Sequence, residues 1–280
     1  MNRSSLLTNL AALLLIWGGM AIGASAQQTQ SVGLSPAYLE ADVARGQAYN
    51  QEFTIVNKTT TRLRFHCSVS DYWYDEKGGR VEGRPGTLPH TASTWIQFTP
   101  SEVVVEPMSS AKVTAVISVP ANATGGYYTI PYFQGEQAEE PNNPNSKKLT
   151  AEYTVAVRLG GLLMFATTTG SEYDLEVKGG AVHPPTSTSP LELELEVENH
   201  GNAHVLLRGT YAFLDAHEHV AGRGQFEEQR YLPGQHRSFK TDWAGDLAPG
   251  HYTTVLTFTY PRAGSTPTSF VYEIPFDVSP

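Results

Sequence analysis

Strict alternation of apolar and charged side chains is the feature that most constrains the fold of this chain. The stretch LELELEVEN, residues 191–199, has Leu or Val at its odd positions and Glu at its even positions up to 198. A repeat of two places these sets on opposite faces of a β-strand. It predicts a strand with an apolar inner face and a solvated outer row of carboxylates. A docking surface for a basic partner or for cations is the functional alternative.

Short runs of the same kind recur along the chain between Gly, Pro, Asn and Asp residues, and no 3.6-residue apolar period accompanies them. They include AYNQEFTIVN, RLRFHCSV, TWIQFTP, SAKVTAVISV, GYYTIPYF, LTAEYTVAVRL, VLLRGTYAFLD, HRSFKTDW, YTTVLTFTY and SFVYEIPFDV. Closely spaced strands with no helices between them are typical of antiparallel sandwiches. The sequence therefore predicts an all-β chain of two immunoglobulin-like β-sandwich domains.

The beginning of the chain has the layout of a secretory signal peptide at residues 1–26. Arg3 is followed by an apolar run and then by the small-x-small site at residues 24–26, so cleavage is expected after Ala26. The two immunoglobulin-like domains are expected at residues 27–168 and 169–280. The polar segment 135–148, which contains two prolines, is expected to be an exposed loop of the first domain.

Charge and cysteine content restrict the compartment and the partners. Removal of the signal leaves 18 basic and 28 acidic side chains, a formal net charge of −10, which argues against nucleic acid or anionic lipid as a partner. A single cysteine cannot form an internal disulfide. No later apolar run approaches the ~20 residues that cross a bilayer, so no integral membrane segment is expected after signal removal. We expect a periplasmic or secreted protein.

The lone cysteine, Cys67, lies beside His66. In a strand these neighbours point to opposite faces, whereas a catalytic thiolate–imidazole pair must be within hydrogen-bond reach. We therefore predict that Cys67 is a buried core thiol with Leu63, Phe65 and Val69 on its face.

The aromatic triplet Tyr72, Trp73 and Tyr74 follows the same strand. Alternation would turn Asp71 inward, so the sequence predicts a bulge or a strand end near Asp71. Trp73 is then expected to join Trp95 in the domain core. A platform for a glycan is the alternative role of the triplet.

No pattern in the chain indicates catalysis or a bound cofactor. Nucleophile elbow, phosphate loop, HExxH and paired catalytic carboxylates are all missing from the sequence. His217 and His219 have a spacing that two metal-ligating imidazoles can use, with Asp215 or His204 as a third ligand, but turns rich in such residues are common. The chain is expected to be non-enzymatic, with no cofactor and no assigned metal site.

Three stretches resemble the first domain of periplasmic pilus-assembly (PapD-like) chaperones and the related immunoglobulin-like domain of bacterial WxL-interacting surface proteins. They are GLSPAYLEADVARGQAYNQEFTIVNKTT, SDYWYDEKGG and RPGTLPHTASTWIQFTPSEVVVEPMSSAKVTAVISVPANATGGYYTIPYF. The shared layout is an opening S-P strand, a strand that ends in V-N, a D-x-x-Y-D-x-x-G hairpin, S-x-W-I-x-x-x-P, and V-P followed by G-Y. The resemblance covers roughly residues 31–135.

This resemblance implies an exported assembly chaperone that binds a protein client, a pilus or surface subunit, by β-strand addition. An alternating strand at a sheet edge offers unpaired backbone groups and a row of apolar side chains to such a client. The corresponding segment is LTAEYTVAVRLGGLLMF, although an ordinary last strand of the domain would alternate in the same way. The client-binding residues that it implies are Tyr153, Val155, Val157, Arg158 and Leu159.

One departure concerns the anchoring of the client. Chaperones of this group hold the client's terminal carboxylate with a first-strand arginine and a last-strand lysine. Arg158 supplies a cation in the last strand, but the first strand, GLSPAYL, has none. Whether this clamp operates therefore stays open. The alternative function is a cell-surface or periplasmic module that recognises peptidoglycan or another glycan through aromatic residues.

Overall fold

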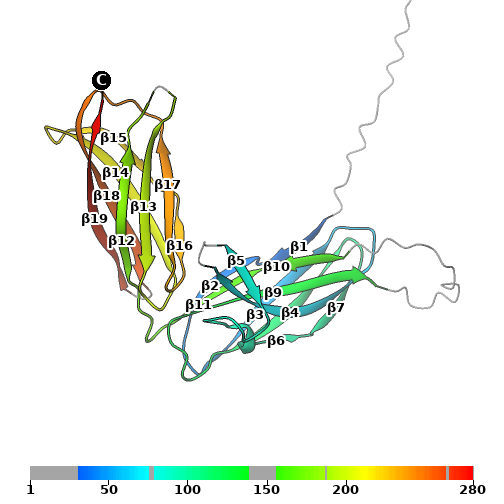
Figure 1. Ribbon diagram of the computed structural model, residues 1–280. Helices are drawn as coiled ribbons and strands as arrows, with labels where there is room; N and C mark the ends of the chain where they lie inside the picture. Colours follow the sequence, from blue (N-terminus) through cyan, green and yellow to red (C-terminus); the bar gives the residue numbers. More distant parts are fainter. Residues whose placement is uncertain (1–30, 76–78, 139–155, 187, 263–264, 280) are drawn as a thin grey trace, which may run out of the picture.

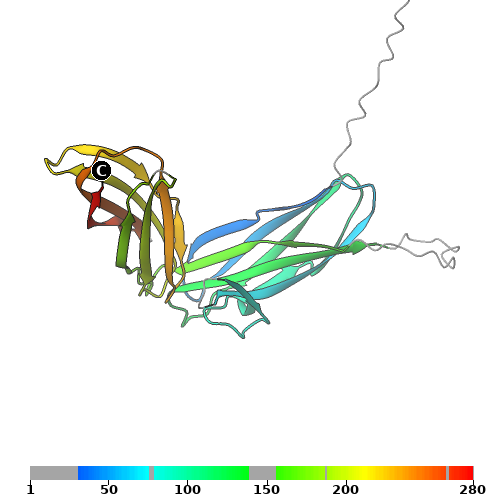
Figure 2. The same cartoon turned by 45° about the horizontal axis from the view of Figure 1, so that its top comes forward.

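Two β-sandwiches make up the described part of the chain. The computed structural model describes residues 31–75, 79–138, 156–186, 188–262 and 265–279. The one helical element in these ranges is a single 3-10 turn, Ser93–Trp95. The sandwiches meet at an angle (Figure 1, Figure 2). The prediction of an all-β chain with two immunoglobulin-like domains is confirmed, and the predicted signal peptide lies outside the described residues.

The first sandwich packs a smaller sheet against a larger one. The smaller sheet has the order β1 (Val32–Ser35), β3 (Ala48–Asn57), β8 (Ser109–Ser118), β6 (Ile96–Thr99). The larger has the order β2 (Tyr38–Val43), β11 (Leu162–Thr167), β9 (Gly126–Gln137), β4 (Leu63–Tyr74), β5 (Arg80–Gly83), while β10 (Val157–Gly160) pairs with β9 and β7 (Glu102–Val105) with β4. Apolar side chains of both sheets, Phe53 and Phe133 among them, are fully buried between them.

The second sandwich has the same two-layer plan. Its smaller sheet has the order β12 (Leu175–His183), β13 (Leu191–Asn199), β17 (His236–Trp243). Its larger sheet has the order β15 (Val220–Gln225), β14 (Val205–Asp215), β18 (Gly250–Arg262), β19 (Ser265–Val278), and β16 (Gln229–Tyr231) pairs with β14. The chain passes from β11 to β12 through residues 168–174.

Strand β13 behaves as its alternation predicts. Its odd side chains, from Leu191 to Val197, have no exposed surface. Its carboxylates lie on the outer face, where the basic side chains of the neighbouring strands contact them; Lys240 Nζ lies 2.8 Å from Glu192 Oε1, and Lys178 Nζ lies 3.5 Å from Glu198 Oε2. The row is therefore an outer face whose carboxylates form ion pairs with Lys178 and Lys240, which agrees with the solvated-face interpretation.

Strand β4 departs from the prediction at Asp71. The register of β4 against β9 and β5 runs without a shift from Leu63 to Tyr74, so the predicted bulge or strand end is wrong. Asp71 does turn inward and is fully buried. Backbone N–H groups of Gly86, Thr87 and Leu88 donate to its carboxylate at 2.6–3.1 Å. Hydrogen bonds from a distant loop thus make an inward carboxylate compatible with a regular strand.

The two tryptophans have different environments. Trp95 is buried in the first core, as predicted. Trp73 is only half-buried and packs with Tyr128 and His90 near the second sandwich, so its predicted place in the domain core is wrong.

Two loop and strand predictions are also revised. Residues 135–137 belong to β9, and the remainder of the predicted loop lies largely outside the described residues. The single predicted strand around residue 160 is split into β10 and β11.

Candidate functional site

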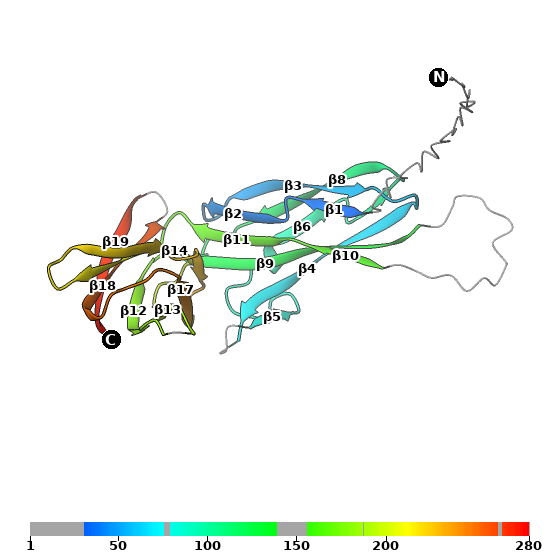
Figure 3. The same ribbon diagram turned by 90° about the horizontal axis from the view of Figure 1, so that it is seen from above.

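Strand β10 has one open edge. It pairs antiparallel with β9, from Val157 opposite Gly135 to Gly160 opposite Tyr132, and with no other described strand. β11 follows in line along β9 (Figure 3) and is covered on its other side by β2, which runs parallel to it from Tyr38. β1, which comes directly before β2 in the chain, pairs with β3 in the opposite sheet. Among the described strands, none pairs with this edge of β10, because β1 pairs in the opposite sheet.

Two hydrogen bonds show which backbone groups of β10 point toward the open edge. Gly161 N donates to Pro131 O of β9 at 3.1 Å, and Leu162 N donates to Ala37 O on the other side at 3.0 Å. Successive residues of a strand direct their backbone groups to opposite sides. Arg158 and Gly160 therefore direct their N–H and C=O groups toward the open edge. These groups can pair with one additional strand.

The side chains of β10 alternate as predicted. Val157 and Leu159 are half-buried on the inner side, and Leu159 packs against the first core, while Arg158 is exposed on the outer face. Tyr153 and Val155, the other two residues predicted to bind a client, lie outside the described residues. A role of any of these five residues in client binding stays a prediction.

A tyrosine positions Arg158 on the outer face. The guanidinium carbon of Arg158 lies 3.5 Å from the centre of the Tyr132 ring. A Cβ on Gly160 would lie 2.7 Å from this ring, so the glycine lets the ring cover β10. Arg158 Nη2 is 3.9 Å from Glu82 Oε2, the acceptor of the Tyr132 hydroxyl at 2.7 Å. The guanidinium is thus held by stacking and only loosely by its ion pair.

Strand β5 supplies a second cation, Arg80, beside Tyr132 and Glu82. Arg80 Nη2 donates to Glu82 Oε1 at 2.7 Å and to the Tyr132 hydroxyl at 3.1 Å. Burial raises the pKa of Tyr132, and its hydrogen bond to Glu82 adds to the rise. Sequence reasoning did not identify Arg80, Glu82 or Tyr132, although the alternating charges of RVEG were a signal of an outward-facing hairpin strand.

The contact between the sandwiches centres on Glu40 of β2. His204 Nε2 donates to Glu40 Oε1 at 3.0 Å, and Arg230 Nη2 donates to Glu40 Oε2 at 3.0 Å. The Tyr38 hydroxyl also donates to this carboxylate. The hydrogen bonds from His204 and Tyr38, together with the positive charge of Arg230, outweigh burial and lower the pKa of Glu40 to about 2. β1 and β2 contain no Lys or Arg, and Arg230 of the second sandwich supplies a cation that contacts Glu40 of β2.

The thiol of Cys67 faces the core side of β4 and is half-buried rather than buried. Cys67 lies just past the last residue pair of β4 and β7. Residues 100–101, which connect β6 to β7, lie beside it there and cover the thiol only in part. Burial still raises its pKa to about 11. His66 points to the opposite face, as expected for neighbours in a strand, and its ring nitrogens lie 3.1 Å from a Glu102 carboxylate oxygen and 3.3 Å from one of Glu136.

In the β14–β15 turn, the His217 and His219 rings are 6.1 Å apart between centres and His219 Nδ1 lies 3.6 Å from Asp215 Oδ2, but these three are not among the described groups whose ligand atoms all lie within 4.8 Å of one another. Asp215 Oδ1 accepts the backbone N–H groups of His217 and His219 and so closes the turn. His204 is bonded to Glu40 at the contact between the sandwiches. No metal site is assigned here.

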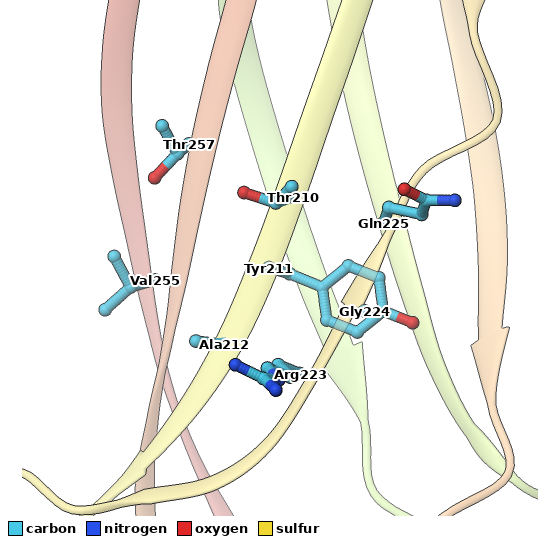
Figure 4. A pocket seen from close by; sticks show the side chains of 8 residues that line it. All are labelled: Thr210, Tyr211, Ala212, Arg223, Gly224, Gln225, Val255 and Thr257. Atoms are coloured by element: carbon cyan, nitrogen blue, oxygen red, sulfur yellow. The ribbon is translucent and has the colours of Figure 1, made fainter.

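A shallow hollow of about 550 Å³ lies on the larger sheet of the second sandwich (Figure 4). Its lining contains small and β-branched residues and one charged side chain, Arg223. The Tyr211 ring packs under Gly224, where a Cβ would lie 2.3 Å from the hydroxyl, so no aromatic face is presented. No helix in the described ranges is long and apolar enough to span a membrane.

No family model matches the sequence, and no curated protein matches it. Solved structures do share similarity with the chain. The class 5 fimbriae chaperone CfaA has a TM-score of 0.48 and 12% identity, over 87% of this chain and 98% of that chain. The E. coli chaperone DraB has a TM-score of 0.41 and 11% identity, over 88% of this chain and 97% of that chain. The Pseudomonas aeruginosa CupB2 chaperone has a TM-score of 0.35 and 10% identity, over 79% of this chain and 91% of that chain. Such chaperones are the group that the sequence resembles.

Proposed function

We propose that this protein is an exported, non-enzymatic assembly chaperone that binds a polypeptide client by β-strand addition. The observation that supports this most directly is the open edge of β10, bounded where β2 begins to cover β11. A client strand in this position would lie in line with β2 and complete the sheet. The resemblance of residues 31–135 to pilus-assembly chaperones also supports this proposal. The client would be a pilus or surface subunit in the periplasm or outside the cell.

The described part of the edge, a short strand with one exposed arginine, has no proline, bulge or inward charge that would block strand addition. Natural edge strands are commonly protected by prolines, bulges or inward charges. β10 has the sequence VRLG, pairs with β9 without a register shift and directs its one charge outward. Backbone pairing would supply sequence-tolerant affinity, and the side chains of the client would supply selectivity.

The alternative of a peptidoglycan-binding platform made of Tyr72, Trp73 and Tyr74 has less support from the geometry. Tyr72 is only 5% exposed, and its hydroxyl donates to that of Tyr74. The three rings therefore do not present one flat surface.

The proposal can be tested with a synthetic peptide of alternating Val and Thr and a free C-terminus, measured by fluorescence anisotropy. Arg158→Pro removes a backbone donor from the open edge, whereas Arg158→Ala removes the same side chain and keeps the donor. We expect Arg158→Pro to bind the peptide more weakly than Arg158→Ala, with the fold of both checked by circular dichroism. Equal binding by the two folded variants, or no binding by the wild type, would refute strand addition at β10.

A further inference from the structure

Two arginines and one glutamate meet on the outer face of the larger sheet of the first sandwich. Arg80 and Glu82 lie two residues apart on β5, so their side chains point to the same face. Arg158 approaches the Glu82 carboxylate from β10, although β9 and β4 lie between β10 and β5 (Figure 3). The group therefore has one positive charge in excess.

The Glu82 carboxylate is bonded to partners other than Arg158. Its Oε1 accepts a hydrogen bond from Arg80 Nη2 at 2.7 Å, and its Oε2 accepts one from the Tyr132 hydroxyl at 2.7 Å. Arg158 Nη2 lies 3.9 Å from Oε2, which is too long for a hydrogen bond. Both oxygens of Glu82 are thus held, and Arg158 gains only the weak attraction of an exposed ion pair.

Arg158 retains unused hydrogen-bond donors. Its contacts within the described ranges are the stacking on Tyr132, at 3.5 Å from the ring centre, and the long contact with Glu82. No hydrogen bond from its guanidinium reaches any residue in these ranges. The side chain is 55% exposed, so a ligand from solution can approach it.

The location of Arg158 links these donors to the open edge. A strand added beside β10 would lie about 4.8 Å away, within the reach of an arginine side chain. Stacking on an exposed ring is weaker than a charge-assisted hydrogen bond to a carboxylate. A carboxylate on the added strand would therefore draw the guanidinium away from Tyr132.

Strand β5 is fixed in place, so Glu82 has a defined position. The Ser70 hydroxyl donates to Gly83 O at 3.0 Å, and Asp75 N donates to Gly79 O at 2.8 Å at the start of the hairpin. The β4–β5 register is regular, with Glu82 opposite Tyr72. The distance between Glu82 and Arg158 therefore depends on the side-chain hydrogen bonds of Glu82.

We propose that Arg80 and the Tyr132 hydroxyl are positioning groups, which hold Glu82 away from Arg158 and so keep Arg158 available for a carboxylate of the client. This inference rests on strand addition at β10 as the function. Without Arg80, one oxygen of Glu82 loses its partner, and the carboxylate turns to Arg158 as an internal competitor of the client. The charge that anchors the client is thus controlled from β5.

The test uses the mature chain and the Val/Thr peptide, prepared as a C-terminal acid and as a C-terminal amide and measured by fluorescence anisotropy. The ratio of the two affinities reports the anchoring of the carboxylate. Arg80→Gln should lower this ratio about 2- to 5-fold, the range expected for one exposed ion pair. Tyr132→Phe, which keeps the ring and removes the hydroxyl, should lower it as well.

The Glu82→Gln background separates a positioning role from direct contact. Glu82→Gln removes the competing charge and should raise the ratio of acid to amide affinity. In this background, Arg80→Gln should have no further effect, because Arg80 acts through Glu82. If Arg80 instead contacts the client's carboxylate, Arg80→Gln lowers the ratio equally in both backgrounds, and the proposal is overturned.

Arg64→Gln is the matched control, because Arg64 is an exposed arginine of the same sheet that pairs with Glu102 at 3.1 Å. It should leave the ratio unchanged, and circular dichroism checks the fold of every variant. Equal binding of acid and amide by the wild type, or a ratio that does not respond to Arg80→Gln, overturns the inference alone. If neither peptide binds, strand addition at β10 fails, and this inference fails with it.

Discussion

His204 of the second sandwich donates a hydrogen bond to Glu40 of the first, with 3.0 Å between Nε2 and Oε1. Only 4% of the imidazole is exposed, and its Nδ1 is buried with no partner among the described residues. Glu40 accepts from Arg230 as well, so one carboxylate connects β2 to two elements of the second sandwich. The angle between the sandwiches therefore depends on a charged group at their contact.

The first prediction is an acid-sensitive contact between the sandwiches. The folded-state pKa of Glu40, about 2, lies below its ordinary value of 4.5. A depressed pKa means that the stabilisation is complete above the ordinary value and is lost as the pH falls from 4.5 through 2. Glu40→Gln should lower stability at neutral pH by about 1 kcal/mol, because the group is partly exposed and screened. Thermal denaturation across this pH range should show the two proteins converging in acid.

The matched control for Glu40 is Glu52→Gln, which removes an exposed pair with Lys112 inside the first sandwich. It should change stability by less than about 1 kcal/mol at any pH. A Glu40→Gln effect that persists unchanged in acid would contradict the assignment of this carboxylate.

The second prediction concerns Asp71, which holds the loop from Gly86 to Ser93. Burial acts to raise its pKa, but the hydrogen bonds from Ser93, Thr91 and the loop backbone outweigh it and lower the pKa. Asp71→Ala leaves three backbone donors without their acceptor and should cost about 3 kcal/mol or more. Asp71→Asn, which keeps one carbonyl oxygen, should cost less. Urea denaturation measures both; an Asp71→Ala variant as stable as wild type would show that water replaces the carboxylate.

The sequence predicted well where structure depends on near neighbours. Alternation defined β3, β13, β14 and β17 at their observed bounds. It also predicted that Val157 and Leu159 share a face, because a period of two is a local property. The open edge itself is not local, since it depends on the crossing of β1 to the opposite sheet.

The features that the sequence did not predict correctly also depend on contacts between residues distant in the chain. Asp71 suggested a bulge because an inward charge is costly, but its donors come from residues 86–93, beyond the hairpin. Glu40 meets His204 and Arg230 across 164 and 190 residues. Contacts at that separation leave no periodic signal in a single sequence.

The third prediction compares two glycines with positive φ. Gly125 (φ +82°) lies at the contact between the sandwiches, where a Cβ would be 2.4 Å from Asn202 O, whereas Gly234 (φ +69°) has nothing within 4 Å. Alanine at a left-handed position costs about 1–2 kcal/mol in either place. Gly125→Ala should cost more, because the Asn202 backbone must also move. Small-angle scattering should show a changed angle between the sandwiches for Gly125→Ala alone; the same profile for both variants would exclude a role of the clash.

The last prediction concerns Arg158 and the terminus of a client. Its side chain is 55% exposed, so Arg158→Ala should change folding stability by less than about 1 kcal/mol. A charge-assisted bond to a terminal carboxylate contributes about 1.5–3 kcal/mol, so the same change should weaken binding of a free-acid peptide about 10- to 100-fold. Capping the peptide as a C-terminal amide should weaken wild-type binding by a similar factor and leave Arg158→Ala unaffected. If the amide and the acid bind the wild type equally, Arg158 does not hold the terminus, and the adjacent cation Arg80 and the backbone of β10 become the groups to examine.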